Sequence, residues 1–384
     1  MSGKTTGCRW LLLLPALLLA WLAVAAGPAA PATRKAARQG PVRSGPAAYY
    51  PLVDRLQPGE RVTVLEKKPR WLKVRTPRAR QGWVSVKLFT APAPARGYQK
   101  LLRDRGLEGT SVSVVTLAGR GLDSGAGGVP AAGGLVREWL VQGGFRPEGL
   151  GDFLERLKPR SCPRALQALG APRQWASSQE AFEAERRLGE AAALRLLGGR
   201  KVITRPELDD YLNKVGTAVA VASERYDVPW RFVLFEQGQP RLLALPGGVV
   251  LLSTGLLGRL EDEAELAGLL AHAVARVVLD QGVKELEGRL PAQGAGLEQA
   301  AGLVLEIAGR AGRREDVDRL AAALCACAGY DPRGLVRVIE RLPELWGQEP
   351  GEARARARRL ERRIEKAGLR GGAVLRERFL VKAR

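Results

Sequence analysis

The spacing of apolar positions divides the chain into two parts. Residues 61–66 alternate between polar and apolar, the pattern of a strand that buries one face, and a second short apolar segment follows at 71–75. From 177 onwards, apolar positions mostly recur every three or four residues, as they do along one face of a helix. The pattern predicts a small all-β unit at 42–90 and a larger, mainly helical domain at 177–345.

The helical domain is also predicted to contain a small sheet. Ser177 and Glu180 form a capping box, and the helix that it opens should end at the glycines at 198–199. The elements expected next are a helix at 206–222, a strand at 230–235, and a strand region at 241–252 that is broken at 246–248. This order of elements predicts the α+β class.

Residues 254–280 are predicted to form one long buried helix. Thr254 is a suitable N-cap, acidic side chains are concentrated at 261–265, and small and apolar side chains continue to Leu279. A helix that is apolar on most sides belongs in the centre of a domain.

The first 26 residues have the layout of a signal peptide. Lys4 and Arg9 precede an apolar run, and the small residues at 23–25 suit a signal peptidase. We therefore expect export and cleavage; the alternative is an uncleaved membrane anchor, for which the run lies near the lower limit of about 17 residues. Residues 27–41 have no hydrophobic period and are predicted to be a basic linker.

Residues 91–176 are predicted to be a linker followed by a helical connecting region. The segments expected within it are helices at 98–121 and 135–158 and a glycine-rich loop at 119–134. The loop lacks the spacing and the preceding strand of a dinucleotide-binding fingerprint, so we expect no nucleotide cofactor here.

The chain is strongly basic, with a formal net charge of +21. Such a chain should associate with anionic surfaces. For an exported protein these are acidic cell-wall polymers or lipid headgroups, and nucleic acid becomes an unlikely partner. The most basic segment is a predicted C-terminal tail at 346–384, where Leu360 and Ile364 suggest a helix with a narrow apolar stripe. Its cationic side is either a membrane-contacting surface or a solvated face.

The cysteines do not resemble a disulfide framework. Cys8 lies within the predicted signal peptide, which leaves the odd set Cys162, Cys325 and Cys327. We interpret these three as small buried side chains, in preference to metal ligands or redox groups.

The β unit resembles the bacterial SH3-like domain. The resemblance rests on Trp71-Leu72-Lys73-Val74-Arg75 and on Gly82-Trp83-Val84-Ser85. It implies a small SH3-like barrel. Trp71 and Trp83 either form its core or bind a ligand, because a domain this short has few other large side chains to bury.

The chain has one histidine, His272, and it lies in the predicted long helix. A zincin helix needs the motif H-E-x-x-H, in which two histidines four residues apart bind zinc and the glutamate takes a proton from metal-bound water. The corresponding positions here hold His272, Ala273 and Arg276.

The segments around this motif resemble the family forty-eight zinc metallopeptidases, the clan of the HtpX and CAAX prenyl proteases. They are Ala244-Leu245-Pro246-Gly247-Gly248, Asp262-Glu263-Ala264-Glu265-Leu266, Arg314-Glu315-Asp316-Val317-Asp318-Arg319 and Ala328-Gly329-Tyr330-Asp331-Pro332. The resemblance covers about 177–342 and implies a zincin-like fold. It also places the third zinc ligand, a glutamate in the family, on Arg314, and keeps the motif's aspartate as Asp318. A register shifted by one residue would offer Glu315 instead.

The resemblance therefore implies an active site that has lost its zinc. An arginine stays protonated and offers no lone pair to a metal, and Ala273 removes the general base. His272 is then a core histidine, or the remnant of a single-ligand metal site. We expect Arg276, Arg314 and Asp318 to converge, with Asp318 paired to one or both arginines. If the positive charge stays uncompensated, the cleft could hold an anion, with strand 241–245 pairing to a peptide.

These features predict an exported pseudo-metallopeptidase, without catalytic residues, cofactor or metal, that acts as a binding or adaptor protein in the periplasm or cell envelope. The expected partners are an envelope protein, a peptide or an anionic cell-wall polymer. The alternative is a zinc-dependent metalloendopeptidase with an atypical site.

Overall fold

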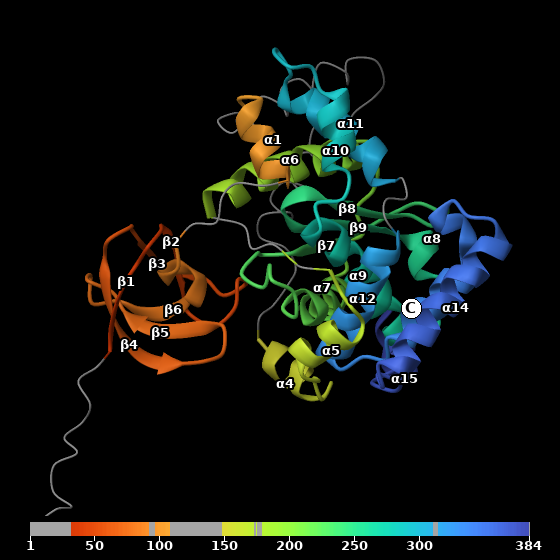
Figure 1. Cartoon of the computed structure of the whole chain (residues 1–384), viewed down its shortest axis with the longest axis horizontal. Helices are drawn as coiled ribbons and strands as arrows, with labels where there is room; N and C mark the ends of the chain where they lie inside the picture. Colours follow the sequence, from red (N-terminus) through yellow and green to blue (C-terminus); the bar gives the residue numbers. More distant parts are fainter. Residues whose placement is uncertain are drawn as a thin grey trace, which may run out of the picture. The chain divides into compact units, whose positions relative to one another are not determined.

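A computed structural model describes residues 32–91, 97–107, 148–172, 174, 179–309 and 314–383 (Figure 1). The chain divides into two compact units: unit 1 holds residues 1–46 and 52–90, and unit 2 holds residues 47–51 and 91–384. The predicted signal peptide, the glycine-rich loop and the capping box at Ser177 all lie outside the described residues.

Unit 1 is a six-stranded antiparallel sheet with the strand order β1-β4-β5-β6-β2-β3. Its strands are β1 (Thr33–Lys35), β2 (Gly40–Arg43), β3 (Leu52–Leu56), β4 (Arg61–Lys67), β5 (Trp71–Arg75) and β6 (Gln81–Ser85), followed by the 3-10 helix η1 (Val86–Phe89). The alternation of β4 turns Val62 and Val64 into a core with Leu72, Val74 and Val84. Trp71 and Trp83 are also buried, which fits their interpretation as core residues.

Two expectations for this unit need correction. The sheet is not a closed barrel, because β1 and β3 remain its two edges among the described strands. The predicted linker at 27–41 contains strand β1, which pairs with 61–63, and the start of β2. The side chains of β1 are all exposed, so this edge strand leaves no hydrophobic period in the sequence.

Unit 2 combines many helices with a three-stranded sheet of order β7-β9-β8. Its strands are β7 (Arg231–Phe235), β8 (Leu242–Leu245) and β9 (Val249–Ser253), with the 3-10 helix η2 (Pro246–Gly248) between the last two. β9 pairs in parallel with β7 and antiparallel with β8. Gly247 in η2 has φ +73°, and a Cβ there would lie 2.4 Å from Cα of Arg186, so the predicted break at 246–248 is a tight turn packed on helix α6.

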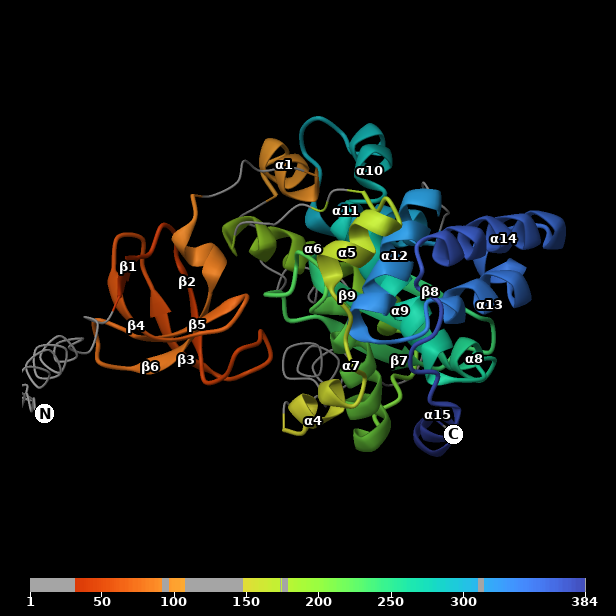
Figure 2. The ribbon, with the colours of Figure 1, turned by 60° about the horizontal axis from the view of Figure 1, so that its bottom comes forward.

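The described helices of unit 2 form two main groups, one that packs around α9 and one that packs around α6 (Figure 2). They are α1 (Gly97–Asp104), α4 (Leu150–Glu155), α5 (Cys162–Ala168), α6 (Gln179–Leu197), α7 (Pro206–Ala220), α8 (Thr254–Leu257), α9 (Glu263–Val278), α10 (Val283–Arg289), α11 (Leu297–Ala308), α12 (Arg314–Ala328), α13 (Arg333–Arg341), η3 (Pro343–Trp346), α14 (Pro350–Lys366) and α15 (Arg376–Ala383). Helices α7, α12 and α13 pack directly on α9. All residues of α9 except Arg276 are buried, as the apolar pattern predicted.

The predicted helix at 254–280 is in fact two helices. α8 ends at Leu257, and α9 begins at Glu263 after its N-cap Asp262, whose Oδ1 accepts from the backbone N–H of Glu265 at 2.9 Å. Thr254 is not an N-cap either, since Ser253 caps α8. The apolar pattern continues across the break, so periodicity alone could not show a second cap inside it.

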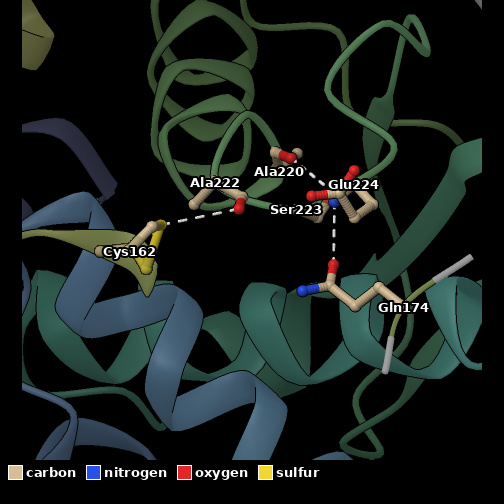
Figure 3. Close-up of a disulfide and its surroundings, with 7 residues drawn as sticks. Cys162, Gln174, Ala220, Ala222, Ser223 and Glu224 are labelled. Carbon is tan, nitrogen blue, oxygen red and sulfur yellow. Dashed lines mark hydrogen bonds between the residues drawn. A yellow bond between two sulfur atoms is a disulfide. The ribbon is translucent and has the colours of Figure 1, made fainter. Parts of the chain in front are cut away.

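Two of the cysteines form a disulfide, which contradicts the sequence interpretation. Cys162 on α5 is bonded to Cys327 on α12, with Cα atoms 4.8 Å apart (Figure 3). Cys325 is a buried free thiol, and burial raises its pKa. The partners are 165 residues apart in sequence, so no local spacing signals the pair, and the odd count pointed away from it.

The predicted basic tail at 346–384 is part of the helical unit. Ala357, Leu360 and Ile364 of α14 are buried, and α14 packs on α12 and α13. α15 packs on α7 and α9. The narrow apolar stripe therefore faces the domain.

No single helix in the described part of the chain is long and apolar enough to span a membrane. α9 and α10 together meet the criteria of length and composition as a pair bent by 52°. The burial of α9 in the core accounts for its apolar character.

Candidate functional site

His272 lies in the last two turns of α9 and is 5% exposed. Its neighbour Ala273 is fully buried in the hydrophobic core. A methyl group therefore stands where the motif requires a glutamate, and a methyl group cannot accept a proton from water.

Asp318 of α12 lies beside His272. Its Oδ1 is 3.6 Å from Nε2 of His272, and its side chain is 4% exposed. Helices α9 and α12 pack along each other, which brings the two residues together although 46 positions separate them. A separation of 3.6 Å is a contact and longer than a good hydrogen bond.

The described cationic partner of Asp318 is Arg356 of α14. Nε of Arg356 donates to Oδ2 at 2.7 Å, and Nη2 donates to Oδ1 at 2.6 Å. Nη2 also lies 3.5 Å from Nε2 of His272. Arg356 is only 4% exposed, so this bidentate ion pair is shielded from water and bears directly on the imidazole.

Two further side chains enclose the guanidinium of Arg356. Nη1 donates to Oε1 of Gln348 at 3.0 Å, and the Trp346 ring centroid lies 4.6 Å from Cζ. The same indole meets the His272 ring edge-on, with centroids 4.7 Å apart. We call His272, Asp318, Trp346, Gln348 and Arg356 the relic cluster.

The other predicted site residues are placed differently. Arg276 follows His272 by one turn of α9, where burial lowers its pKa and the Tyr98 hydroxyl of α1 opposes that effect. Glu315, the ligand offered by a shifted register, has a 61% exposed side chain that pairs with Arg363 at 2.6 Å. The side chain of Arg314 lies outside the described residues, so its pairing with Asp318 stays a prediction.

The relic cluster does not suit a zinc ion. Across the described side chains, no group of three or more His, Cys, Asp or Glu residues is arranged to hold a metal. Both carboxylate oxygens of Asp318 already accept hydrogen bonds from Arg356. The positive charge of Arg356 also lies beside His272. A zinc ion would have to displace that guanidinium and then lack the three protein ligands of a catalytic site.

A cavity of about 420 Å³ lies beside the relic cluster, between α12 and α14. It is lined by Glu315, Asp318, Arg319, Gln348, Glu352, Ala355, Arg356, Arg359, Leu360 and Arg363. Charged side chains of both signs line it. A metal ion that entered this cavity would meet arginines before it reached Asp318.

Arg356, Trp346 and Gln348 are the residues that sequence reasoning missed. Arg356 stands in a run of arginines that looked like a solvated face. The signal was its spacing: Ala353, Arg356, Ala357, Leu360 and Ile364 recur at helical intervals, which places this one arginine on the buried stripe.

Two segments of the chain match known protein families. Residues 206–314 match the family model of Peptidase family M48. Residues 39–90 match that of the Bacterial SH3 domain. The resemblance stated from the sequence is thereby confirmed in both parts of the chain. The Peptidase family M48 match spans α7, the three-stranded sheet and α9, and it ends at Arg314.

Several curated proteins are similar over the same region. The putative beta-barrel assembly-enhancing protease of Vibrio cholerae is 27% identical over 181 residues, which are 41% of this chain and 37% of that protein. The beta-barrel assembly-enhancing protease of Yersinia pestis is 24% identical over 186 residues, 42% of this chain and 38% of that protein. The mitochondrial metalloendopeptidase OMA1 of Arabidopsis thaliana is 27% identical over 153 residues, 36% and 31% of the two chains. The chain thus spans less than two fifths of the length of these relatives.

Proposed function

We propose that this chain is a non-catalytic relative of the Peptidase family M48 enzymes that acts by binding in the cell envelope. The observation that carries the proposal is the guanidinium of Arg356, bound to both oxygens of Asp318 beside the lone histidine. Ala273 and Arg276 add to it, because the general base and the second imidazole are replaced at the same time.

Export agrees with the chemistry of the described residues. The Cys162–Cys327 disulfide is the kind of bond that persists in oxidising compartments, such as the bacterial periplasm. We therefore propose that the first 26 residues direct export and that the mature protein works outside the cytoplasm.

An extended polypeptide is the partner class that we propose. β8 is an edge strand of its sheet in the described structure, and it lies against α9. An edge strand can accept one more strand through main-chain hydrogen bonds. Since bacterial relatives are named for enhancing beta-barrel assembly, we favour unassembled β-rich chains as partners.

A photo-crosslinker at position 242, on the half-buried start of β8, tests this partner class. We expect covalent capture of an unfolded β-barrel polypeptide added to the purified protein. The matched control places the crosslinker at exposed Lys158. Equal capture from both positions would contradict strand addition at β8.

Metal analysis and a cleavage assay test the loss of catalysis. We expect the purified full chain to carry far less than one zinc per molecule and to leave casein intact. Stoichiometric zinc with chelator-sensitive cleavage would overturn the proposal and establish the metalloendopeptidase alternative.

Restoring variants show whether Arg356 opposes the metal. One variant combines Ala273→Glu, Arg276→His and Arg314→Glu, and a second adds Arg356→Ala. If the guanidinium excludes zinc, the second variant should bind zinc at least about tenfold more tightly, because a like charge beside the metal is gone. Equal affinity would show that only the missing ligands matter.

A further inference from the structure

Helix α14 is held in one orientation by its buried side. Ala353, Ala357 and Ile364 are at most 1% exposed, and Arg356 on the same side is fixed by Asp318. Because an α-helix turns by about 100° per residue, these contacts also determine which residues face outward.

The outward side of α14 is cationic. Its exposed basic residues without an ion pair are Arg354, Arg358, Arg359, Arg362 and Lys366. Four of them recur every fourth residue and so form a row with a rise of about 6 Å between neighbours. We call these five residues the α14 basic row.

The α14 basic row is not neutralised by acidic neighbours. Among the described side chains, none of its members makes an ion pair, whereas Arg363 at its margin pairs with Glu315. The acidic residues of α14 are Glu352, Glu361 and Glu365, and Glu365 is itself paired with Arg370. Five like charges on a fixed helix face therefore remain available to a partner.

The composition of this face decides the class of partner. It has no aromatic residue, so it lacks the stacking surface used for single-stranded nucleic acid. Its one apolar member is Ala355, too small to insert into hydrocarbon. What remains is a rigid row of guanidinium and ammonium groups, which suits a surface of phosphate headgroups.

We propose that the α14 basic row docks this protein on the surface of an anionic lipid membrane. The proposal adds a second partner to the binding function proposed above. It rests on that function, because it takes the chain to act by binding and without catalysis. Docking through this face leaves the opposite, buried side of α14 closed over the relic cluster.

Vesicle sedimentation of the full chain tests the proposal. The probes are vesicles of pure phosphatidylcholine and vesicles that contain about one third phosphatidylglycerol. We expect binding to the anionic vesicles that weakens as salt is raised. The triple variant Arg358→Gln, Arg362→Gln and Lys366→Gln should bind them at least about tenfold more weakly, since each basic group near the surface contributes to the attraction.

A matched triple variant removes the same charge elsewhere. Arg156→Gln, Arg164→Gln and Lys284→Gln alter exposed residues at the C-cap of α4, in α5 and in α10. This variant should bind the anionic vesicles with nearly the affinity of the native chain. Any binding through the first 26 residues is the same in the native chain and both triple variants, so it cannot cause a difference between them. Equal loss in both triple variants, or binding that ignores headgroup charge and salt, would overturn the proposal. Neither result would change the zinc content that tests the loss of catalysis.

Discussion

Two of the carboxylates buried along α9, Glu263 and Asp318, are neutralised in different ways. Glu263, at the start of the helix, accepts from the hydroxyls of Tyr211 at 2.8 Å and Tyr330 at 2.7 Å and pairs with Arg378 of α15. Asp318, beside His272, receives two hydrogen bonds from the single side chain of Arg356. We call the first group the Glu263 cluster.

The difference shows where the fold depends on one residue. Three side chains share the charge of Glu263, so the loss of one leaves two donors in place. In the relic cluster, the guanidinium of Arg356 pairs with Asp318, contacts His272 and packs on Trp346. In both clusters the cation comes from the C-terminal helices, which explains why this basic segment is folded onto the domain.

Arg356→Met should cause the largest loss of stability. The change breaks the bidentate pair with the buried carboxylate of Asp318, and removing one partner of a buried ion pair typically costs about 3–5 kcal/mol. Urea unfolding of the full chain measures it. Arg358→Met, on the exposed side of the same helix, is the control and should change the free energy of unfolding by less than about 0.5 kcal/mol.

The double variant Asp318→Asn with Arg356→Met sharpens the result. It removes both charges, so it should be more stable than Arg356→Met alone. If the double variant is the less stable of the two, the ion pair is not what Arg356 contributes.

A third buried ionic cluster makes the stability of the protein depend on pH. Arg225 forms ion pairs with two carboxylates, those of Glu185 and Asp280. Burial of Asp280, together with the charge of Glu185, outweighs the attraction of Arg225 and raises the pKa of Asp280 from 3.8 to about 7. Between these values the folded state keeps a proton that the unfolded chain releases, so stability from this group falls as pH rises from about 4 to about 7.

Asp280→Asn should remove that dependence, because asparagine does not titrate. The advantage of the native chain over Asp280→Asn at pH 4.5 should shrink by about 1.4 kcal/mol for each unit of pH up to about 7. Thermal melts of both proteins across this range measure it. A constant difference between the two proteins would show that Asp280 is ionised throughout.

Loss of the disulfide should cost about 2–4 kcal/mol, because Cys162–Cys327 closes a loop of 165 residues in the unfolded chain. Cys162→Ala with Cys327→Ala tests this, and dithiothreitol should destabilise the native chain but leave the double variant unchanged. Cys325→Ala is the control, since it removes a buried thiol without opening a cross-link. Equal sensitivity of both proteins to the reductant would place the effect elsewhere.

The fold was predictable where local pattern decides it. Strands β4, β5, β7, β8 and β9, helices α6 and α7 and the position of His272 followed from periodicity and motif, because burial repeats along the chain. The relic cluster was only half predictable. His272 and Asp318 stand at positions that the resemblance pointed to. The spacing in α14 marks Arg356 as buried, but only the packing of α14 on α12 brings it to Asp318.

The same limit explains the missed disulfide and the missed strand β1. Cys162 and Cys327 meet because α5 packs on α12, and β1 forms because β4 offers a free edge. Both depend on contacts between distant segments, and neither leaves a hydrophobic period of its own.

Arg378→Met should cost less than Arg356→Met, about 1–2 kcal/mol, because Tyr211 and Tyr330 still donate to Glu263. Tyr330→Phe should have a similar effect for the same reason. When Arg378→Met and Tyr330→Phe are combined, the loss should exceed the sum of the two, since each single variant relies on the donors that the other removes. Urea unfolding of the four proteins forms a complete cycle. Additive losses would show that the donors to Glu263 act independently. The Glu263 cluster would then not differ from the relic cluster in the way described above.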